Sequence, residues 1–493
     1  MNFLQNKNIV IMGGGTAGWI AALKFLVENK KQNLNLKVTL ISSEEIGIIG
    51  VGEGSTPLFA DYVNDICQTS IENFLYETKG AIKYGIKFDN WNFDNEYYYH
   101  LFTSHSSYEH PNYHLIYNFC QYAINNNLNI PQKEIQKKIH GISFDLVEDN
   151  FVNFNINSRF AYHFDAKLLV KYFKSLADSF SEFTHINDKI IDIKYNNEKI
   201  ESLALENNGF ITGDFFINSL GLHDKSNSQD IEELNVIPNN KAITIQVKNS
   251  ETDILEPYTT STAQDYGWTW KIPQYEKTGY GYVYSDNFVK NEDELYDNII
   301  QSYKINEKNI IRSNKVSFRS FYNKKQLKSN CLYLGLSSGF LEPLEATSIN
   351  LTLTSLNLFF DLASQSHELE LHNIKTFNDT LSKIWEGVKN FIVMHYFNGS
   401  TKNDYWKYFN SLNSNSKLFK MNRDNYDHVA FAYTINSFYS ITLGLNSKDF
   451  SYTQEENKYM KNHIETFFMT DHHLDSKRLM TQNEILNAIN LKN

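Results

Sequence analysis

The order of apolar and polar segments at the start of the chain predicts a strand, a turn, a helix and a second strand. Asn8–Met12 is a short apolar run typical of a buried parallel strand, and Trp19–Val27 has the apolar content of a packed helix. Leu36–Ile41 supplies the second strand, and the turn after the first strand reads Gly13-Gly14-Gly15-Thr16-Ala17-Gly18. A βαβ unit with GxGxxG at its first turn predicts a dinucleotide-binding domain, because the glycines let a pyrophosphate reach the helix N-terminus.

The end of the second strand lacks the carboxylate that usually binds a ribose in such domains. Ser42 and Ser43 stand there, so either a serine hydroxyl or one of the acids Glu44 and Glu45 takes this role. A second glycine-rich loop, Gly50–Pro57, follows too late to belong to the first crossover. We interpret it either as a plain connection or as a strap over the cofactor ring.

Further along, the pattern predicts a helix, a β-meander and a return to the first sheet. The helix is expected to run from Ala161–Asp165 to about Leu176. The predicted strands of the meander are Lys189–Ile193, Ile200–Leu205 and Phe210–Ile217. This layout resembles that of the flavoprotein monooxygenases. The chain is rich in strand patterns from about 240 to 330 and helical after residue 364.

The segment Gly335–Asn350 combines a tight turn with the start of an apolar helix. It follows the short strand Cys331–Leu334, and Thr347 or Ser348 is a natural N-cap for the helix. A helix start offers free backbone N–H groups and a partial positive charge, which suit an anion or an electron-rich cofactor edge. Glu345 stands directly before it. The alternative interpretation is an ordinary capped helix after a turn.

Composition and charge narrow the class of protein. The chain has 493 residues, of which 41% are hydrophobic and 15% aromatic, enough for two or three lobes with large cores. Its net charge of -11 argues against nonspecific nucleic-acid binding, which needs a basic face. Three separated cysteines without CxxC, no basic leader and no apolar run of about 18 residues predict a reduced, cytoplasmic protein outside the membrane.

Lys83 and a following aromatic segment are candidates for chemistry. Lys83 is flanked by apolar residues, so it is either a buried, pre-positioned donor or an ordinary strand-edge lysine. Residues Tyr97–His114 form either an aromatic wall for a planar substrate or plain core packing. His110 and His114 have the spacing of helical metal ligands, but Pro111 and the lack of HExxH argue against a metal site.

Taken together, these motifs resemble those of the flavin-dependent halogenases of the tryptophan halogenase family. The Gly13–Gly18 turn, the Val51–Pro57 loop, the Lys83 strand and the segment Gly339-Phe340-Leu341-Glu342-Pro343-Leu344-Glu345 follow that family's order. Most diagnostic is Trp268-Thr269-Trp270-Lys271-Ile272-Pro273, the WxWxIP signature that separates these halogenases from flavin hydroxylases. The resemblance covers roughly residues 8 to 445.

The resemblance implies an α/β fold with a GxGxxG, Rossmann-like FAD-binding module of the flavoprotein monooxygenase type over residues 1–365. Within it, β-rich parts at about 85–160 and 235–325 are expected on the substrate side, and residues 366–493 form a helical lobe that caps the substrate. A separate reductase would supply FADH2, O2 and chloride or bromide would be co-substrates, and the substrate would be a small, indole- or tryptophan-like aromatic. A homodimer is a candidate assembly, and no nucleic acid, membrane or metal is expected as a partner.

The family's site residues can be matched to positions of this chain. Lys83 would hydrogen-bond hypohalous acid or form a haloamine, and Glu345 would orient the electrophile or take the ring proton. The backbone N–H groups of Thr347 and Ser348 would bind the halide. The expected FAD contacts are Gly13, Gly15, Thr16, Ala17, Gly18, Ser42, Val51, Gly52, Ile190, Leu336 and Ile349. The expected substrate contacts are His100, Phe102, Phe431, Asn436, Phe438 and Tyr439.

Two departures from the family pattern bear on these roles. Ala346 and Ser348 stand where the family's FxxPxxSxG pattern has Ser and Gly. Asp427, Phe431 and Ala432 align with a glutamate and a Phe-Trp pair that grip free tryptophan, so the indole-stacking Trp is missing and a bulkier aromatic has room. Two other functions stay open: an aromatic hydroxylase, which would turn over without halide, and a non-catalytic flavin-binding protein, which would not need Lys83.

Overall fold

The computed structural model describes residues 2–43, 53–93, 96–102, 113–153, 159–221, 230–397, 400–415, 433, 435–446, 454–469 and 479–492. The chain forms two compact units, each assembled from three stretches of sequence. Unit 1 comprises Met1–Lys79, Phe164–Ile237 and Phe318–Lys389, and unit 2 comprises Gly80–His163, Pro238–Ser317 and Asn390–Asn493.

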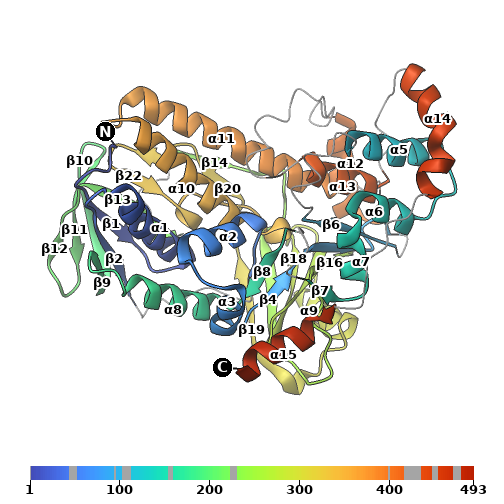
Figure 1. Cartoon of the computed structure of the whole chain (residues 1–493), viewed down its shortest axis with the longest axis horizontal. Helices are drawn as coiled ribbons and strands as arrows, with labels where there is room; N and C mark the ends of the chain where they lie inside the picture. The colour runs from blue at the N-terminus through green and yellow to red at the C-terminus, as the bar shows by residue number, and fades with distance from the viewer. Residues whose placement is uncertain are drawn as a thin grey trace. The chain divides into compact units, whose positions relative to one another are not determined.

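A six-stranded sheet forms the centre of unit 1 (Figure 1). Its order is β21-β22-β13-β1-β2-β9, parallel from β22 to β9 with an antiparallel edge at β21. The strands are β1 (Asn8–Met12), β2 (Lys37–Ser42), β9 (Phe183–Asn187), β13 (Phe215–Asn218), β21 (Leu327–Lys328) and β22 (Cys331–Tyr333). This is the Rossmann-like arrangement that the βαβ pattern predicts.

Both faces of this parallel sheet are covered, which explains why its strands are continuous apolar runs. On one face Val10 and Phe216 pack with the three-stranded sheet that follows β9 in the chain. On the other face Phe215 stacks on Phe359, with ring centroids 4.9 Å apart. The covering strands are β10 (Ile190–Asn196), β11 (Lys199–Leu205) and β12 (Phe210–Ile211).

The helices of unit 1 are α1 (Thr16–Gln32), α2 (Pro57–Tyr62), α3 (Ile71–Thr78), α8 (Ala166–Ala177), α10 (Thr347–Gln365) and the first part of α11 (Leu371–Met394). Helix α1, dark blue in Figure 1, packs on strands β1, β2 and β13 of the sheet, and α8 and α10 pack against α1. A single π-helical turn, Val63–Cys67, follows α2. A further small sheet joins β14 (Ile231–Glu233), β20 (Phe321–Asn323) and β23 (Gly339–Phe340).

Two sequence-based expectations in this region are wrong. Residues Ala161–Phe164 form strand β8, and helix α8 begins only at Ala166, because the Asp165 side chain accepts hydrogen bonds from the N–H groups of Lys167 and Leu168 as its N-cap. The expected strand Phe210–Ile217 is two strands, since β12 belongs to the three-stranded sheet and β13 to the parallel sheet. Gly213 lies between them, where the chain changes sheets.

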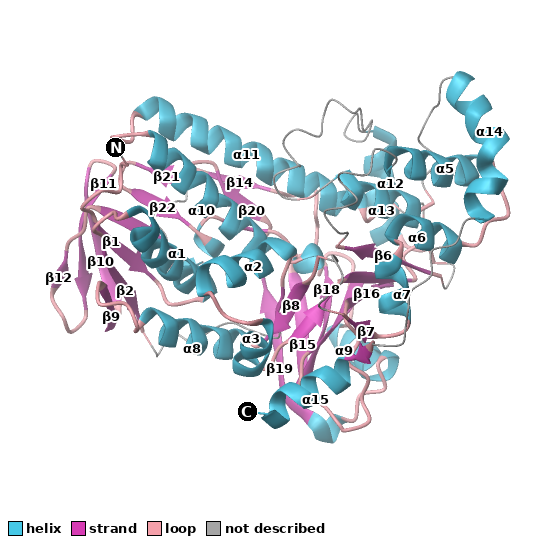
Figure 2. Cartoon of the chain, viewed as in Figure 1, coloured by secondary structure: helices cyan, strands magenta, loops and turns pink. Residues whose placement is uncertain are grey.

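Unit 2 is built on a seven-stranded sheet of order β19-β15-β18-β17-β16-β5-β6 (Figure 2). Its strands are β5 (Gly85–Asp89), β6 (Tyr97–Leu101), β15 (Lys241–Lys248), β16 (Thr259–Gln264), β17 (Gly267–Pro273), β18 (Lys277–Tyr284) and β19 (Ile310–Ser317). On one face Ile243, Ile245 and Tyr282 pack against helix α9 (Glu292–Ser302). The alternation of side chains puts Trp268 and Trp270 on the opposite face.

Short strand pairs and helices complete unit 2. Strand β4 (Ala81–Lys83) pairs antiparallel with β8, and β7 (Phe151–Val152) pairs with β24 (Met480–Thr481). The helices are α5 (Tyr113–Asn125), α6 (Gln132–His140), α7 (Ile142–Glu148), α12 (Asp404–Asn415), α13 (Ile435–Gly444), α14 (Gln454–Met469) and α15 (Gln482–Lys492). Among the described helices of both units, none combines the length and apolar character needed to cross a bilayer.

The segments expected to form the substrate side come together in unit 2, which contains 80–163 and 238–317. The expected boundary at residue 366 falls between α10 and α11. The two compact units divide within α11, after Lys389. The first part of α11 therefore packs with the nucleotide-binding sheet, where Asn378 bonds both backbone groups of Leu327 in β21.

Candidate functional site: a dinucleotide cradle and a buried lysine

The glycine-rich turn after β1 has the close approaches that its sequence predicts. Gly13 has φ +107°, and a Cβ there would lie 2.5 Å from the carbonyl oxygen of Ser219. A Cβ on Gly18 would lie 2.0 Å from the carbonyl oxygen of Gly13, so only glycine lets the helix start so close to the turn. At Gly15, in contrast, no atom lies within 4 Å of the Cβ position, so this side of the turn is open.

Helix α1 presents its N-terminus at this open side. Gly15 is the N-cap, no side chain caps the first turn, and the first turn carries no acidic residue. The N–H groups of Thr16 and Ala17 therefore stand at a positive helix end without a competing carboxylate. An open, uncapped helix start beside a glycine turn fits the pyrophosphate of a dinucleotide such as FAD.

Ser42 lies at the end of β2, beside this turn. A Cβ on Gly14 would lie 2.4 Å from the Cβ of Ser42, which shows how closely the two segments approach. The Ser42 hydroxyl is 2.9 Å from Nε2 of His185, a residue of the neighbouring strand β9. A hydroxyl can donate and accept at once, so Ser42 keeps capacity for a ribose hydroxyl. Glu44, Glu45, Val51 and Gly52 lie outside the described residues.

The segment after β22 meets the glycine turn from the other side. Gly335 has φ +59°, and a Cβ there would lie 2.7 Å from the Cβ of Ala17. The N–H group of Gly221 donates to the Ser337 hydroxyl at 2.8 Å, which ties this segment to the end of β13. The half-buried Leu336 is thereby placed beside the predicted cofactor turn. Its expected contact with the flavin is consistent with this position.

Ile190 lies in a different environment. It is partly buried and packs against the apolar cluster that includes Met12, Ile41 and Leu203. The structure therefore gives it a core role on the covered face of the parallel sheet, and its contact with FAD stays a prediction.

The start of α10 is the predicted halide site, and its capping differs from expectation. The helix begins at Thr347, and neither Thr347 nor Ser348 is the N-cap. The N-cap is Ala346, in the left-handed conformation with φ +54°, and no side chain bonds the first turn. The expectation of a hydroxyl cap is wrong. The 3-10 turn Pro343–Glu345 ends directly before Ala346, so Thr347 is already the first helical residue and Ala346 is the N-cap.

The residues at this uncapped helix start are buried, and polar side chains lie beside it. Thr347 is 2% exposed, and Ile349 is also buried. The Thr56 hydroxyl donates to Oδ1 of Asn350 at 3.0 Å, so the end of the second glycine-rich loop is held against the first turn of α10. The carboxyl group of Glu345 is buried one residue before the N-cap. Backbone N–H groups at a positive helix end, shielded from water, can hold an anion.

Lys83 is a buried lysine in unit 2. It ends strand β4, is 1% exposed, and its Nζ lies 5.5 Å from the centroid of the Phe102 ring. Of the two interpretations of Lys83, the structure supports the buried one. A cation over an aromatic face is stabilised by the ring quadrupole, which offsets part of the loss of water.

Aromatic side chains join Lys83 to the helical part of unit 2. The His100 ring is 6.2 Å from Phe102 and 5.9 Å from Phe391. Phe391 in turn is 4.9 Å from Phe438 and 4.3 Å from Tyr433. Three of the predicted substrate residues are thus linked through Phe391: His100 and Phe438 contact it directly, and Phe102 contacts His100. Sequence analysis predicts only that the region of Phe391 is helical, because an aromatic residue at a helical position looks the same in a core and in a site.

The other predicted substrate residues lie elsewhere or outside the description. Tyr439 stacks on Tyr117 at 3.7 Å, within a separate cluster of α5, α6 and α13. Asn436 is buried near the start of α13. Phe431 lies outside the described residues. Tyr439 therefore belongs to the packing of these helices, and its substrate contact stays a prediction.

Strand β6, which carries His100, forms hydrogen bonds through the side chains on its opposite face. The hydroxyls of Tyr97 and Tyr99 donate to Glu148 at 3.0 and 2.9 Å, and Lys133 pairs with the same carboxylate at 2.9 Å. Burial alone would raise the pKa of Glu148, but the hydrogen bonds from Lys133, Tyr99 and Tyr97 outweigh it and lower that pKa. Sequence analysis missed Glu148, since nothing local indicates that two tyrosines of one strand converge on it.

The WxWxIP signature lies in β17. Trp268 and Trp270 are buried on the sheet face that also carries Phe88 and Ser261. A Cβ on Gly281 would lie 2.1 Å from the Trp270 ring, so this glycine in the neighbouring strand makes room for the indole. The motif therefore depends on a partner glycine in the GYGYVY segment of β18.

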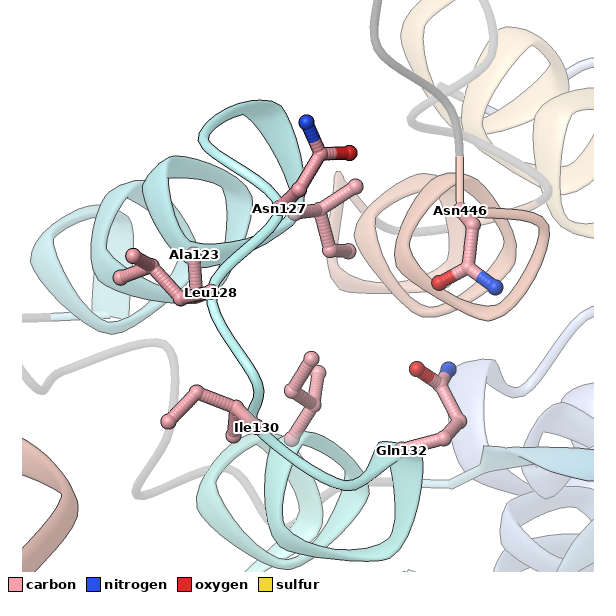
Figure 3. A pocket seen from close by; sticks show the side chains of 8 residues that line it. Ala123, Asn127, Leu128, Ile130, Gln132 and Asn446 are labelled. Atoms are coloured by element: carbon pink, nitrogen blue, oxygen red, sulfur yellow. The ribbon is translucent and has the colours of Figure 1, made fainter.

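A surface pocket in unit 2 involves none of these groups. It measures about 260 Å³ and lies between α5, α6 and the end of α13. In Figure 3 the amides of Gln132 and Asn446 point toward each other from two sides of this pocket. Within the described residues, no group of three or more His, Cys, Asp and Glu side chains could hold a metal ion. His110 and the side chain of His114 lie outside that description.

Comparison with known proteins assigns the family. A family model described as tryptophan halogenase matches residues 8–455. Tryptophan 6-halogenase SttH of Streptomyces toxytricini is 25% identical over 441 residues, which cover 83% of this chain and 81% of SttH. Tryptophan 7-halogenase RebH of Lentzea aerocolonigenes is 26% identical over 425 residues, which cover 81% of this chain and 78% of RebH.

A solved structure confirms the fold class. The structure of a tryptophan halogenase from Shewanella frigidimarina NCIMB 400 has a TM-score of 0.83 and 21% sequence identity, covering 100% of this chain and 99% of its own. The predicted α/β fold with a Rossmann-like FAD domain and a helical C-terminal region is confirmed by this agreement. The chain belongs to the tryptophan halogenase family and is a flavin-dependent halogenase, an oxidoreductase.

Proposed function

We propose that this protein uses FADH2, O2 and chloride or bromide to halogenate an electron-rich, indole-like aromatic compound through Lys83 and Glu345. The observation that carries this proposal is Lys83 itself. A lysine that is 1% exposed, with Nζ 5.5 Å from the Phe102 ring, is expensive to bury and suits a role as a fixed donor or amine nucleophile. A flavin hydroxylase has no need for such a lysine.

Unit 1 supplies the cofactor site. The N–H groups of Thr16 and Ala17 and the open face of Gly15 would bind the pyrophosphate, Ser42 a ribose hydroxyl, and Leu336 and Ile349 the ring system. Reduced FAD, delivered by a separate reductase, supplies the electrons for oxygen activation when it is bound. The buried residues around the ring would keep bulk water away from this chemistry.

The start of α10 would hold the halide. The N–H groups of Thr347 and Ser348 lie in the first turn of a helix without a capping side chain or an acidic residue in that turn. The helix dipole favours an anion there. Ala346 lacks the hydroxyl of the family pattern, so backbone donors alone would carry the binding.

Lys83 would receive hypohalous acid and aim it at one carbon of the substrate. Its amine either donates a hydrogen bond to the oxidant or forms a haloamine, and Glu345 accepts the proton that leaves the ring when aromaticity returns. The cluster of His100, Phe102, Phe391 and Phe438 would hold the planar substrate by ring contacts. SttH and RebH are named as tryptophan halogenases, and tryptophan-like compounds are therefore the first substrates to test.

The decisive variant is Lys83→Met, which keeps the unbranched apolar stem of the side chain and removes the amine. We expect no halogenated product from an indole mixture with a generic flavin reductase, while flavin binding stays within a factor of two or so of the native protein, because the cradle lies in unit 1. Product is read by the halogen isotope pattern in mass spectrometry, and flavin binding by fluorescence.

Lys87→Met is the matched control. Lys87 also lies over an aromatic ring, with Nζ 3.9 Å from the centroid of Tyr97, but it is only half-buried and its side chain leaves β5 on the face that carries Tyr97. This variant should retain activity. Full activity of Lys83→Met would refute the proposal, and oxygenated product formed without halide would identify a hydroxylase instead.

A further inference from the structure

Strand β4, which ends at Lys83, is paired with another strand on one side only. Among the described strands its partner is β8. On the other side the N–H group of Ile82 donates to Oε1 of Gln482 at 2.8 Å, and the N–H group of Tyr84 donates to the carbonyl oxygen of Pro257 at 2.7 Å. Successive N–H groups of a strand point to opposite sides, so these two hydrogen bonds bracket Lys83 on the side away from β8.

The side-chain amide of Gln482 takes the place of a neighbouring strand on this edge. Gln482 is 1% exposed, and its Nε2 donates to the carbonyl oxygens of Leu255 and Glu256 at 3.2 and 3.0 Å. A side-chain amide offers the same kinds of donor and acceptor as a peptide group. Gln482 therefore joins β4 to residues 255–256 much as a strand residue would, and removing its amide would leave buried backbone groups on both sides unpaired.

The start of helix α15 fixes where this amide lies. The N–H group of Thr481 donates to the Glu484 carboxylate at 2.8 Å, and the N–H group of Glu484 donates to the Thr481 hydroxyl at 3.3 Å. This reciprocal pair is a capping box, which sets the first turn of the helix directly after Thr481. Strand β24, which ends at Thr481, is in turn paired with β7. Gln482, the first residue of α15, is thus held at a defined place.

The segment that Gln482 contacts is also tied to the WxWxIP strand. The Glu256 carboxylate pairs with Nζ of Lys271 in β17 at 2.6 Å. The backbone carbonyl of the same glutamate accepts a hydrogen bond from Gln482. A continuous series of polar contacts therefore runs from the Ile82 N–H group through Gln482 and Glu256 to the WxWxIP motif.

We propose that Gln482 is a positioning residue for Lys83: its buried amide fixes the edge of β4 and thereby the place from which the lysine side chain extends. This inference rests on the proposed role of Lys83. A displacement of about 1 Å can cost a reaction up to about 100-fold, and a shift of the backbone at Ile82 moves the next residue with it. Without this contact, hypohalous acid would still form but would meet a misplaced amine and escape. Gln482 lies beyond residue 445, where the resemblance of the motifs ends, so the sequence did not indicate it.

Two neighbouring residues of α15 allow a matched test. Gln482→Met keeps the unbranched stem and removes the amide. Asn483→Ala is the control, because Asn483 accepts from the Leu255 N–H group at 2.9 Å and donates to the Asp253 carbonyl oxygen at 2.8 Å. These bonds join α15 to the same loop without involving β4. The readout is the ratio of halogenated indole to hypohalous acid caught by a soluble 1,3-diketone trap, together with the total of the two.

We expect Gln482→Met to lower the ratio about tenfold or more at an unchanged total, because the amine is misplaced while the oxidant still forms. Asn483→Ala should stay within about twofold of the native ratio, since the Ile82 bond persists. A native ratio in Gln482→Met, or a comparable fall in Asn483→Ala, would overturn the inference. So would an equal loss of product and trapped oxidant in Gln482→Met, which would show a merely structural role.

A second measurement does not depend on halogenation. In protein with ¹⁵N-labelled isoleucine, the amide signal of Ile82 is assigned by its loss in Ile82→Val and followed during exchange into D2O. Exchange should be about tenfold faster or more in Gln482→Met and near native in Asn483→Ala. With ¹⁵N-labelled lysine, the side-chain signal of Lys83, assigned by its loss in Lys83→Met, should shift in Gln482→Met only.

Unchanged exchange at Ile82, or an unshifted Lys83 signal, would overturn the inference. Both changes in Gln482→Met together with full activity of Lys83→Met would refute the proposed function and leave the contact between Gln482 and β4 standing. The failure of the inference and the failure of the proposed function are thereby distinguished.

Discussion

Units 1 and 2 build their sites from different parts of the chain. In unit 1 the proposed cofactor cradle at Gly13–Gly18 and the proposed halide site at the start of α10 consist of backbone N–H groups at helix ends that no side chain caps. In unit 2 the proposed site consists of side chains: Lys83 lies near the Phe102 ring and His163, and Phe102 in turn contacts His100. A backbone site needs particular dihedral angles and close approaches, so glycine is its signature. A side-chain site needs neighbours from distant strands and helices, so it leaves a weaker local signal.

Glu345→Gln tests whether unit 1 works through backbone groups alone. Glu345 is a buried acid at the end of the turn before α10. If it accepts the ring proton, the neutral amide should cut turnover by roughly 100-fold or more, the range of a general base, while flavin and halide binding persist. Steady-state turnover and halide titration of bound flavin would measure this. A near-normal rate would mean that the Glu345 carboxylate does not accept the proton.

Gly15→Ala and Gly18→Ala should separate binding from stability. A Cβ at Gly15 meets no atom within 4 Å, so the folded protein accepts it, but it would intrude on a pyrophosphate and weaken FAD about tenfold or more. A Cβ at Gly18 would meet the Gly13 carbonyl at 2.0 Å, so this variant should lose stability as well. Thermal denaturation without flavin and flavin titration measure the two effects. Native FAD affinity in Gly15→Ala would contradict the assignment of the cradle.

Glu53, a residue of unit 1, has a raised pKa that makes stability depend on pH. Burial, and then the charge of Asp165, raises its pKa to about 7 from 4.5. The folded protein therefore keeps this proton up to about pH 7, whereas the unfolded chain releases it near pH 4.5, so this group makes stability fall as the pH rises between those values. Glu53→Gln should stabilise the protein at pH 8 and change little at pH 4. Denaturant unfolding at both pH values would show it, and an equal effect at both would disprove the titration.

Ala346→Gly should give the smallest effect. Ala346 holds φ +54° as the N-cap of α10, a conformation that costs an L-residue about 1 kcal/mol and costs glycine little. The free energy of unfolding should rise by up to about 1 kcal/mol, less the entropy that glycine adds to the unfolded chain. Denaturant unfolding would measure it, with product formation as the check that the helix start is unchanged. A clear loss of stability would mean that the methyl group packs against something essential.

Local patterns were enough to predict the framework. The parallel strands, the glycine turn at Gly13–Gly18 and the apolar helix after Pro343 are each determined by neighbouring residues, and the structure confirms them. The WxWxIP motif marked the family without any contact being known. The two wrong predictions of local structure have a common cause. Ala161–Phe164 is a strand because it pairs with β4, and Ala346 is an N-cap because the preceding turn ends at Glu345.

The sequence by itself determined the nucleotide-binding module, the family and the identity of Lys83 as a candidate, because short motifs carry their own geometry. Only the tertiary structure decided which side chains surround that lysine. Register between β4 and β8 places His163 beside it, and the packing of Phe391 gathers His100 and Phe438 while Tyr439 stacks away on Tyr117. These contacts join residues that are tens to hundreds of positions apart, and no local pattern encodes the pairing of two such segments.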